Sequence, residues 1–132
     1  MRAFANPLGV KLLIENLQNE VTQSANILEI LSSGHLRDIG VCLDVGHAYL
    51  GEGVAATLAA LKPLLRSSHL HDNHGEKDEH LWPGDGNIAW DEVFEGLMTA
   101  PQTPAGVLEI HYTLDDTVET VGQKAAKAFE KF

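Results

Sequence analysis

Four side chains that can bind a metal stand at or near the ends of apolar runs in the sequence. Glu15 follows Leu-Leu-Ile, Asp44 follows Val-Cys-Leu, His69 ends the run Arg-Ser-Ser-His, and Glu109 follows Gly-Val-Leu. A charge beside an apolar run needs a partner, because an unpaired buried charge is costly. Three carboxylates and one imidazole form a mostly hard, oxygen-rich ligand set that suits Mn²⁺, Mg²⁺ or Co²⁺, with Zn²⁺ as an alternative. The four residues therefore predict a divalent metal site, provided that the fold brings them together.

Further histidines and acids lie close to these four residues in the sequence. His47 comes three positions after Asp44, and the glycine between them allows a tight turn that would place the two side chains together. His71 would share a face with His69 if the strand continues, because side chains alternate with period two. Asp78 and His80 form an Asp-x-His pair. This pair can ligate an additional metal, but a polar loop that covers the site explains it equally well.

The elements that must position these groups alternate between strands and helices. Apolar runs predict strands over 10–14, 39–43 and 105–110, and a more polar strand is predicted over 66–71. Helical spacing of apolar residues predicts helices over 21–31, 53–65, 90–98 and 114–132, with a long polar loop over 72–89. This alternation predicts a parallel sheet with right-handed crossovers. The carboxyl ends of parallel strands lie at one edge of a sheet, so we expect the four ligands to converge there.

The length of the chain limits the architecture. Its 132 residues allow one domain, whereas a complete (β/α)₈ barrel needs about 250 residues. We therefore predict an α/β fold in which a single domain, 1–132, forms a parallel (β/α)₄ half of a TIM barrel. Four strands taken from a barrel leave two open edges. We accordingly expect a homo-oligomer, or a partner half-barrel missing from the N-terminal side, rather than a well-behaved monomer.

Composition excludes several classes of protein. The formal net charge of −10 argues against binding to nucleic acid, because phosphate backbones are repelled by an acidic surface. The chain has no apolar run long enough for a membrane span and no secretory signal, so we expect no membrane partner. The single cysteine, Cys42, excludes an internal disulfide and favours a reducing, cytoplasmic location.

The motifs together resemble a known superfamily. In order, they are Leu-Ile-Glu15-Asn, Cys-Leu-Asp44-Val-Gly-His47-Ala, His69-Leu-His-Asp72-Asn, Asp78-Glu-His80-Leu-Trp-Pro-Gly-Asp-Gly-Asn-Ile-Ala-Trp90 and Val-Leu-Glu109-Ile. Each motif alone is loose, but the ordered series resembles the xylose isomerase-like TIM-barrel superfamily, which includes sugar phosphate isomerases/epimerases and endonuclease IV. The resemblance covers nearly the whole chain and corresponds to the C-terminal half of that fold, strands five to eight.

The resemblance to the sugar epimerases implies roles for these residues. It implies a single divalent metal held by Glu15, Asp44, His69 and Glu109. Glu15 and Glu109 would also act as acid and base on opposite sides of a sugar, while the metal polarises the carbonyl and stabilises an enediolate. His47 would contact the substrate, and we assign His71 to substrate binding as well. We therefore predict a sugar or sugar-phosphate isomerase/epimerase with a small-molecule sugar substrate. The epimerases carry an arginine beyond the metal histidine, and the corresponding loop of this chain has none. The residues therefore do not identify the sugar.

Two alternatives remain at this stage. The resemblance to endonuclease IV implies a zinc phosphodiesterase whose ligands would be Glu15, Asp44, His47, His69, Asp78, His80 and Glu109. That enzyme takes further histidine ligands from the first half of its barrel, and the acidic charge of this chain opposes a grip on DNA. The other alternative is a catalytically incomplete half-barrel, which binds metal but turns nothing over without the other half.

Overall fold

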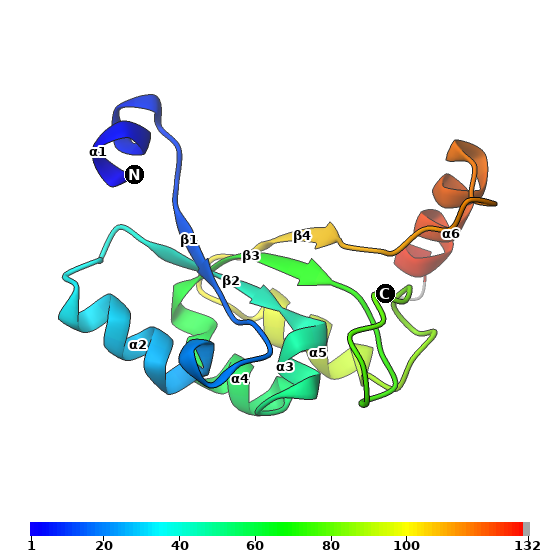
Figure 1. Ribbon diagram of the computed structural model, residues 1–132, viewed down its shortest axis with the longest axis horizontal. Helices are drawn as coiled ribbons and strands as arrows, with labels where there is room; N and C mark the ends of the chain where they lie inside the picture. Colours follow the sequence, from blue (N-terminus) through cyan, green and yellow to red (C-terminus); the bar gives the residue numbers. More distant parts are fainter. Residues whose placement is uncertain (131–132) are drawn as a thin grey trace.

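The computed structural model describes residues 1–130 and contains one parallel sheet of four strands (Figure 1). The strands are β1 (Leu13–Glu15), β2 (Gly40–Asp44), β3 (Leu65–Leu70) and β4 (Ala105–Leu108), and they pair in sequence order. All three pairings are parallel. The predicted α/β class and parallel order are therefore confirmed. The register sets Asp44 of β2 opposite His69 of β3, which in turn lies opposite Val107 of β4.

Helices cover one face of this sheet. The helices on that side are α2 (Ser24–Ser33), α3 (Val45–Leu50), α4 (Val54–Leu61) and α5 (Trp90–Met98) (Figure 1). The core lies between them and the sheet, where Val41 and Leu43 of β2 pack with Ile27, Leu61 and Val93. The remaining helices, α1 (Arg2–Ala5) and α6 (Val118–Glu130), lie toward the two ends of the sheet. Short 3₁₀ turns occupy Asn6–Leu8, Glu20–Thr22 and Lys62–Leu64.

Several elements differ in extent from the sequence prediction. Strand β1 is displaced toward the C-terminus relative to the predicted 10–14, so that Glu15 lies in the strand itself. A short helix, α3, follows Asp44 where only a tight turn was predicted. The predicted helix over 53–65 ends at Leu61, and the next turn contains Pro63. The last helix begins at Val118 rather than at 114, and the predicted extension to Phe132 falls outside the described residues.

The opposite face of the sheet and its outer strands are open. Among residues 1–130, β1 and β4 each pair with only one neighbouring strand. Apolar side chains on these strands are accessible, because Val107 exposes 48% and Leu13 exposes 37% of its surface. In a closed barrel this face would be the packed interior. None of the helices within the described part of the chain has the length and apolar character needed to cross a membrane.

Candidate metal centre

Glu15, Asp44, His69 and Glu109 converge at the carboxyl ends of the four strands, and we call them the strand-end cluster. One ligand atom from each lies within 4.8 Å of the others. His69 Nδ1 is 2.8 Å from Glu109 Oε2, 3.3 Å from Glu15 Oε1 and 3.7 Å from Asp44 Oδ2. Asp44 is fully buried, whereas Glu15 and Glu109 remain partly accessible. The sheet therefore brings together the four residues that the sequence placed at its edge.

The polar atoms of the strand-end cluster fit a cation. His69 Nδ1 and Glu109 Oε2 are both buried, and although they lie close together, neither makes a hydrogen bond of acceptable geometry. Buried polar atoms normally have a hydrogen-bond partner, so such orphans need an explanation. Three carboxylates around one imidazole also leave excess negative charge. A divalent cation would satisfy both the orphaned atoms and the charge, and this oxygen-rich set suits Mn²⁺, Mg²⁺, Co²⁺ or Zn²⁺.

Asp44 is the best-anchored member of this cluster. Its backbone N–H donates to Asn16 Oδ1 at 2.9 Å, and Asn16 Nδ2 donates back to the Asp44 carbonyl at 2.8 Å. Its Oδ1 accepts from the backbone N–H of His47 at 2.7 Å, which caps helix α3, and from His71 Nε2 at 3.0 Å. These bonds fix the carboxylate at the end of β2. Sequence analysis did not assign a role to Asn16, although its position directly after Glu15 was a signal.

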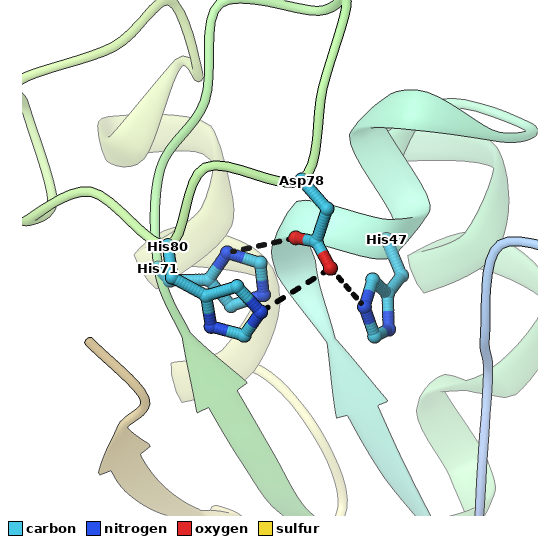
Figure 2. A group of neighbouring side chains, drawn as sticks. All are labelled: His47, His71, Asp78 and His80. Atoms are coloured by element: carbon cyan, nitrogen blue, oxygen red, sulfur yellow. Dashed lines mark hydrogen bonds and ion pairs between the residues drawn. The ribbon is translucent and has the colours of Figure 1, made fainter. Parts of the chain in front are cut away.

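A second group lies beside the first, and Figure 2 shows it: His47, His71, Asp78 and His80, here called the loop cluster. Asp78 is at its centre. Its Oδ2 is 3.1 Å from His47 Nε2 and 3.2 Å from His80 Nε2, and its Oδ1 is 3.8 Å from His71 Nδ1. The rings of His71 and His80 stack with their centroids 3.9 Å apart. The predicted Asp-x-His pair thus lies with His47 and His71 rather than in an isolated loop.

Backbone carbonyls orient two of the imidazoles toward Asp78. His47 Nδ1 is 3.1 Å from the carbonyl oxygen of Asn16, and His80 Nδ1 is 2.8 Å from that of Glu109. A carbonyl can only accept, so each Nδ1 carries the proton, and in the neutral ring each Nε2 faces Asp78 with a lone pair. Metal-binding histidines are typically held in this way. Lone pairs aimed at a carboxylate repel it unless a cation or a proton lies between them.

The pKa values of His47 and Asp78 reflect this arrangement. Burial lowers the pKa of His47, but the nearby carboxylates of Asp44 and Asp78 outweigh it and hold that pKa above its ordinary value. Burial likewise raises the pKa of Asp78, but the hydrogen bond from His47 and the charge of His80 outweigh it and hold that pKa below its ordinary value. The raised pKa of His47 and the lowered pKa of Asp78 both favour a positive charge beside the Asp78 carboxylate. Without a metal, the loop cluster therefore retains a proton on His47 more readily than a free imidazole would.

Asp72 holds the loop that carries Asp78 and His80. Its fully buried carboxylate accepts four hydrogen bonds, from the backbone N–H groups of Asn73, Gly84 and Ile88 and from the indole N–H of Trp90. Its backbone forms an antiparallel bridge with Leu81 that closes the intervening loop. His80, inside that loop, adopts a left-handed backbone with φ of 50°, which is uncommon for a residue other than glycine. No structural role was predicted for Asp72, because its burial depends on how the loop folds and cannot be read from the residue type.

The predicted substrate-binding residues occupy different environments. His47 is partly accessible and lines a cleft of about 310 Å³ with Asn16, Gln23 and Glu52. His71 directly follows β3, which ends at Leu70, and it is completely buried. Its two nitrogens face Asp44 and Asp78 rather than the cleft. A direct substrate contact by either residue stays a prediction.

The fold and the strand-end cluster together define half of an α/β barrel that gathers its polar groups at the carboxyl ends of parallel strands. The family described as xylose isomerase-like TIM barrel matches residues 2–130, and the chain belongs to that family. The resemblance carried by the motifs is thereby confirmed.

Relatives and solved structures extend this result. The chain is 34% identical over 102 residues to the uncharacterized protein MJ1311 of Methanocaldococcus jannaschii, a match that covers 71% of this chain and 34% of that protein. A D-tagatose 3-epimerase-like protein has a TM-score of 0.72 and 28% identity, covering 98% of this chain and 52% of that one. A D-psicose 3-epimerase crystallised in the presence of D-fructose, at 21% identity and a TM-score of 0.79, shares the fold over 98% of this chain and 50% of its own. The chain therefore spans about a third of the curated relative and about half of each solved structure.

Proposed function

We propose that this chain supplies the metal-binding half of a divalent-metal-dependent sugar or sugar-phosphate isomerase/epimerase. The observation that carries the proposal is the strand-end cluster, in which three carboxylates and one imidazole meet at the ends of four parallel strands with two orphaned buried atoms. The 28% identity to a D-tagatose 3-epimerase-like protein supports the same class of substrate. Glu15, Asp44, His69 and Glu109 would hold the metal.

The two glutamates of the strand-end cluster are suited to proton transfer. Glu15 lies on β1 and Glu109 directly follows β4, so they reach the centre from the two outer strands of the sheet. One carboxylate takes the proton from the carbon next to the sugar carbonyl, and the C–H electron pair moves toward the carbonyl oxygen to leave an enediolate. The other, in its acid form, returns a proton to the opposite face or to the neighbouring carbon. The bound cation would polarise that carbonyl.

We place the sugar beside His47, whose two ring nitrogens face the Asn16 carbonyl and Asp78, so that its contact with the sugar would be made by the ring carbons. Its side chain lines the cleft that Asn16, Gln23 and Glu52 also line, and these polar groups suit a hydroxylated ligand. His47 Nδ1 also lies 3.9 Å from Glu15 Oε1, so a ligand in this cleft would border the proposed proton-transfer group. His71 does not line this cleft; it would act indirectly, by holding Asp44 in the strand-end cluster.

The first test is metal content after purification without a chelator or an affinity metal. The proposal predicts about one Mn, Co, Mg or Zn per chain in the strand-end cluster, lost in Asp44→Ala. Any sugar that responds should then exchange a carbon-bound proton with deuterated solvent, and Glu15→Gln and Glu109→Gln should each abolish that exchange. Full exchange in both variants, on every responsive sugar, would contradict the mechanism.

We also propose that the complete sugar pocket needs four further strands. The described strands would correspond to strands five to eight of a barrel, and the others would come from an N-terminal half-barrel or from a second copy of this chain. The open outer strands and the exposed Val107 support this proposal. Sedimentation velocity should show self-association of the isolated chain. A sharp monomer peak combined with cooperative unfolding would contradict the need for a partner.

A zinc phosphodiesterase resembling endonuclease IV is the second candidate function. The loop cluster favours it, because three imidazoles and one carboxylate suit zinc and could provide more than one metal position beside the strand-end cluster. The formal charge of −10 opposes it. Cleavage of a duplex with an abasic site, supplied with zinc and lost in His80→Ala, would favour the phosphodiesterase. An uncleaved duplex would leave the isomerase/epimerase proposal standing alone.

A further inference from the structure

We propose that His71 serves both clusters at once, orienting Asp44 through Nε2–H and offering Nδ1 as a fourth ligand to a cation in the loop cluster. The inference rests on the proposed metal-dependent function. The residue is a positioning residue for the strand-end cluster and a ligand for the loop cluster. Within the loop cluster, His71 is the residue whose ring hydrogen-bonds to a strand-end carboxylate, through Nε2 to Asp44. Its other ring nitrogen, Nδ1, has no hydrogen-bond partner.

The two nitrogens of His71 have different surroundings. Nε2 lies 3.0 Å from Asp44 Oδ1 and 3.2 Å from Oδ2, so this nitrogen carries the proton and donates to the carboxylate. Nδ1 is buried without a hydrogen-bond partner, and it faces Asp78 Oδ1 at 3.8 Å. The whole side chain has no accessible surface. A buried nitrogen lone pair without a donor is therefore aimed into a site that already holds two other imidazole nitrogens and a carboxylate.

The packing around His71 keeps the ring in this orientation. A Cβ added to Gly46 would lie 2.0 Å from Cε1 of His71, so only glycine at the start of α3 leaves room for the imidazole. On the other side the ring stacks on His80. Asn73 Nδ2 donates to the Gly46 carbonyl at 3.1 Å and ties the segment after β3 to α3. The ring cannot exchange its two nitrogens without disturbing these contacts.

Substitutions at position 71 can remove the contact made by Nδ1 separately from the contact made by Nε2. Glutamine at position 71 can still donate an N–H to Asp44 from the place of Nε2, but it has no lone pair at the place of Nδ1. His71→Gln should therefore preserve Zn²⁺ affinity at the strand-end cluster and lower Zn²⁺ affinity at the loop cluster by at least about tenfold. His71→Ala removes both contacts and should lower affinity at both. His74→Gln is the matched control, because His74 lies in the same loop and its ring bonds to Glu79 and not to either cluster.

The experiment is titration of the metal-free full chain with Zn²⁺ by calorimetry, with circular dichroism as a check that each variant is folded. A double-mutant cycle with Asp78→Asn adds a test that a purely structural role would not pass. If His71 and Asp78 share one cation, His71→Gln should cost little further affinity once Asp78 is changed. Equal loop-cluster affinity in wild type and folded His71→Gln would overturn the inference.

Nitrogen-detected NMR of the zinc-loaded wild-type chain keeps the proposal testable if the variants do not fold. The ring of His71 should bind zinc through Nδ1, whereas His47 and His80 should bind through Nε2. A zinc-bound loop cluster in which His71 Nδ1 is free overturns the inference and leaves the proposed function intact. Zinc bound at the strand-end cluster alone does the same. If neither cluster binds zinc, the inference fails; if the strand-end cluster also takes up no Mn²⁺, Co²⁺ or Mg²⁺, the metal-dependent function fails as well.

Discussion

The strand-end cluster and the loop cluster are neighbours, but they are built in opposite ways. The strand-end cluster has three carboxylates and one imidazole, and its outer ligands are accessible, with side-chain exposures of 31% for Glu15 and 44% for Glu109. The loop cluster has three imidazoles and one carboxylate; His47 and His80 expose only 12% and 11% of their side chains, and Asp78 exposes 31%. An oxygen-rich site can accept a substrate beside a hard cation, whereas a nitrogen-rich site with four ligands suits zinc.

The two clusters also depend on different parts of the fold. Each strand-end ligand belongs to a different strand or directly follows one, so backbone pairing along the sheet fixes its position. Two members of the loop cluster, Asp78 and His80, come from an irregular segment that Asp72 anchors through four hydrogen bonds. The strand-end cluster should therefore be as stable as the sheet, whereas the loop cluster should lose its geometry when the single buried carboxylate of Asp72 is removed.

Asp72→Ala should produce the largest effect, and it should separate the clusters. The change leaves four N–H donors without their acceptor, three of them on the backbone. Because hydrogen bonds to charged groups contribute about 1.5–3 kcal/mol each, we expect a loss of at least about 3 kcal/mol in the free energy of unfolding. Zinc binding at the loop cluster should be lost, while the folded fraction keeps a cation at the strand ends. Urea unfolding and metal titration measure the two effects.

Asp85→Ala is the matched control for that prediction, because Asp85 is an exposed carboxylate in the same loop. It should change the free energy of unfolding by less than about 0.5 kcal/mol. Equal destabilisation by the two substitutions would mean that the loop loses stability through its overall charge and not through the four bonds to Asp72.

Asp78→Asn and Glu109→Gln form a pair that should divide metal selectivity. Asp78 is the only carboxylate of the loop cluster, so Asp78→Asn should lower zinc affinity there by at least about tenfold and leave manganese binding at the strand ends unchanged. Glu109→Gln should do the reverse, because the Glu109 carbonyl that holds His80 is retained. Competition between Mn²⁺ and Zn²⁺ measures both. If either substitution weakens both metals equally, the clusters act as one site.

The pH dependence of the stability of the metal-free chain should include a contribution from the loop cluster. A raised pKa of folded His47 stabilises the fold at pH values below its unfolded pKa, near 6.5, and this contribution is lost as pH rises through the folded value. A lowered pKa of Asp78 stabilises the fold above its unfolded pKa, near 3.9, and this contribution is lost as pH falls through the folded value. Both contributions are present between about pH 4 and pH 6.5.

NMR titration of the histidine rings checks the sign of this prediction. In the metal-free chain His47 should titrate above its ordinary value, and Asp78→Asn should bring its pKa down by removing one of the nearby carboxylates that raise it. A His47 pKa below the ordinary value would mean that burial dominates and that the cluster does not attract positive charge.

The pattern of apolar runs predicted the four strands and the main helices because those elements depend on local periodicity. Helix α3 was missed for a physical reason. It is only six residues long and begins immediately after β2, and Asp44, which was assigned as a ligand, is also its N-cap. One side chain has two roles there, because Asp44 caps the helix and also belongs to the strand-end cluster. The displacement of β1 has a similar origin, because Glu15 pairs within the sheet despite its charge.

The strand-end cluster could be predicted from the sequence because its members occupy equivalent positions on successive parallel strands. The loop cluster could be predicted only in part. The spacing predicted that His47 lies near Asp44 and that Asp78 and His80 act together, but their meeting depends on bonds from Asp72 to residues as distant as Trp90. Strand alternation could not fix the position of His71, because β3 ends one residue earlier, at Leu70.

Glu79→Gln should have the smallest effect, and it tests how local the loop cluster is. Glu79 lies between Asp78 and His80, but its Oε2 accepts from the backbone N–H and the ring Nδ1 of His74, both at 2.8 Å. These bonds hold the pKa of Glu79 below its ordinary value, so the contact with His74 weakens as pH falls. We expect zinc affinity within about twofold of wild type by calorimetry. A loss of zinc affinity as large as that in Asp78→Asn would mean that the Glu79–His74 turn, rather than Asp72, holds the loop cluster in position. Only that turn would have changed.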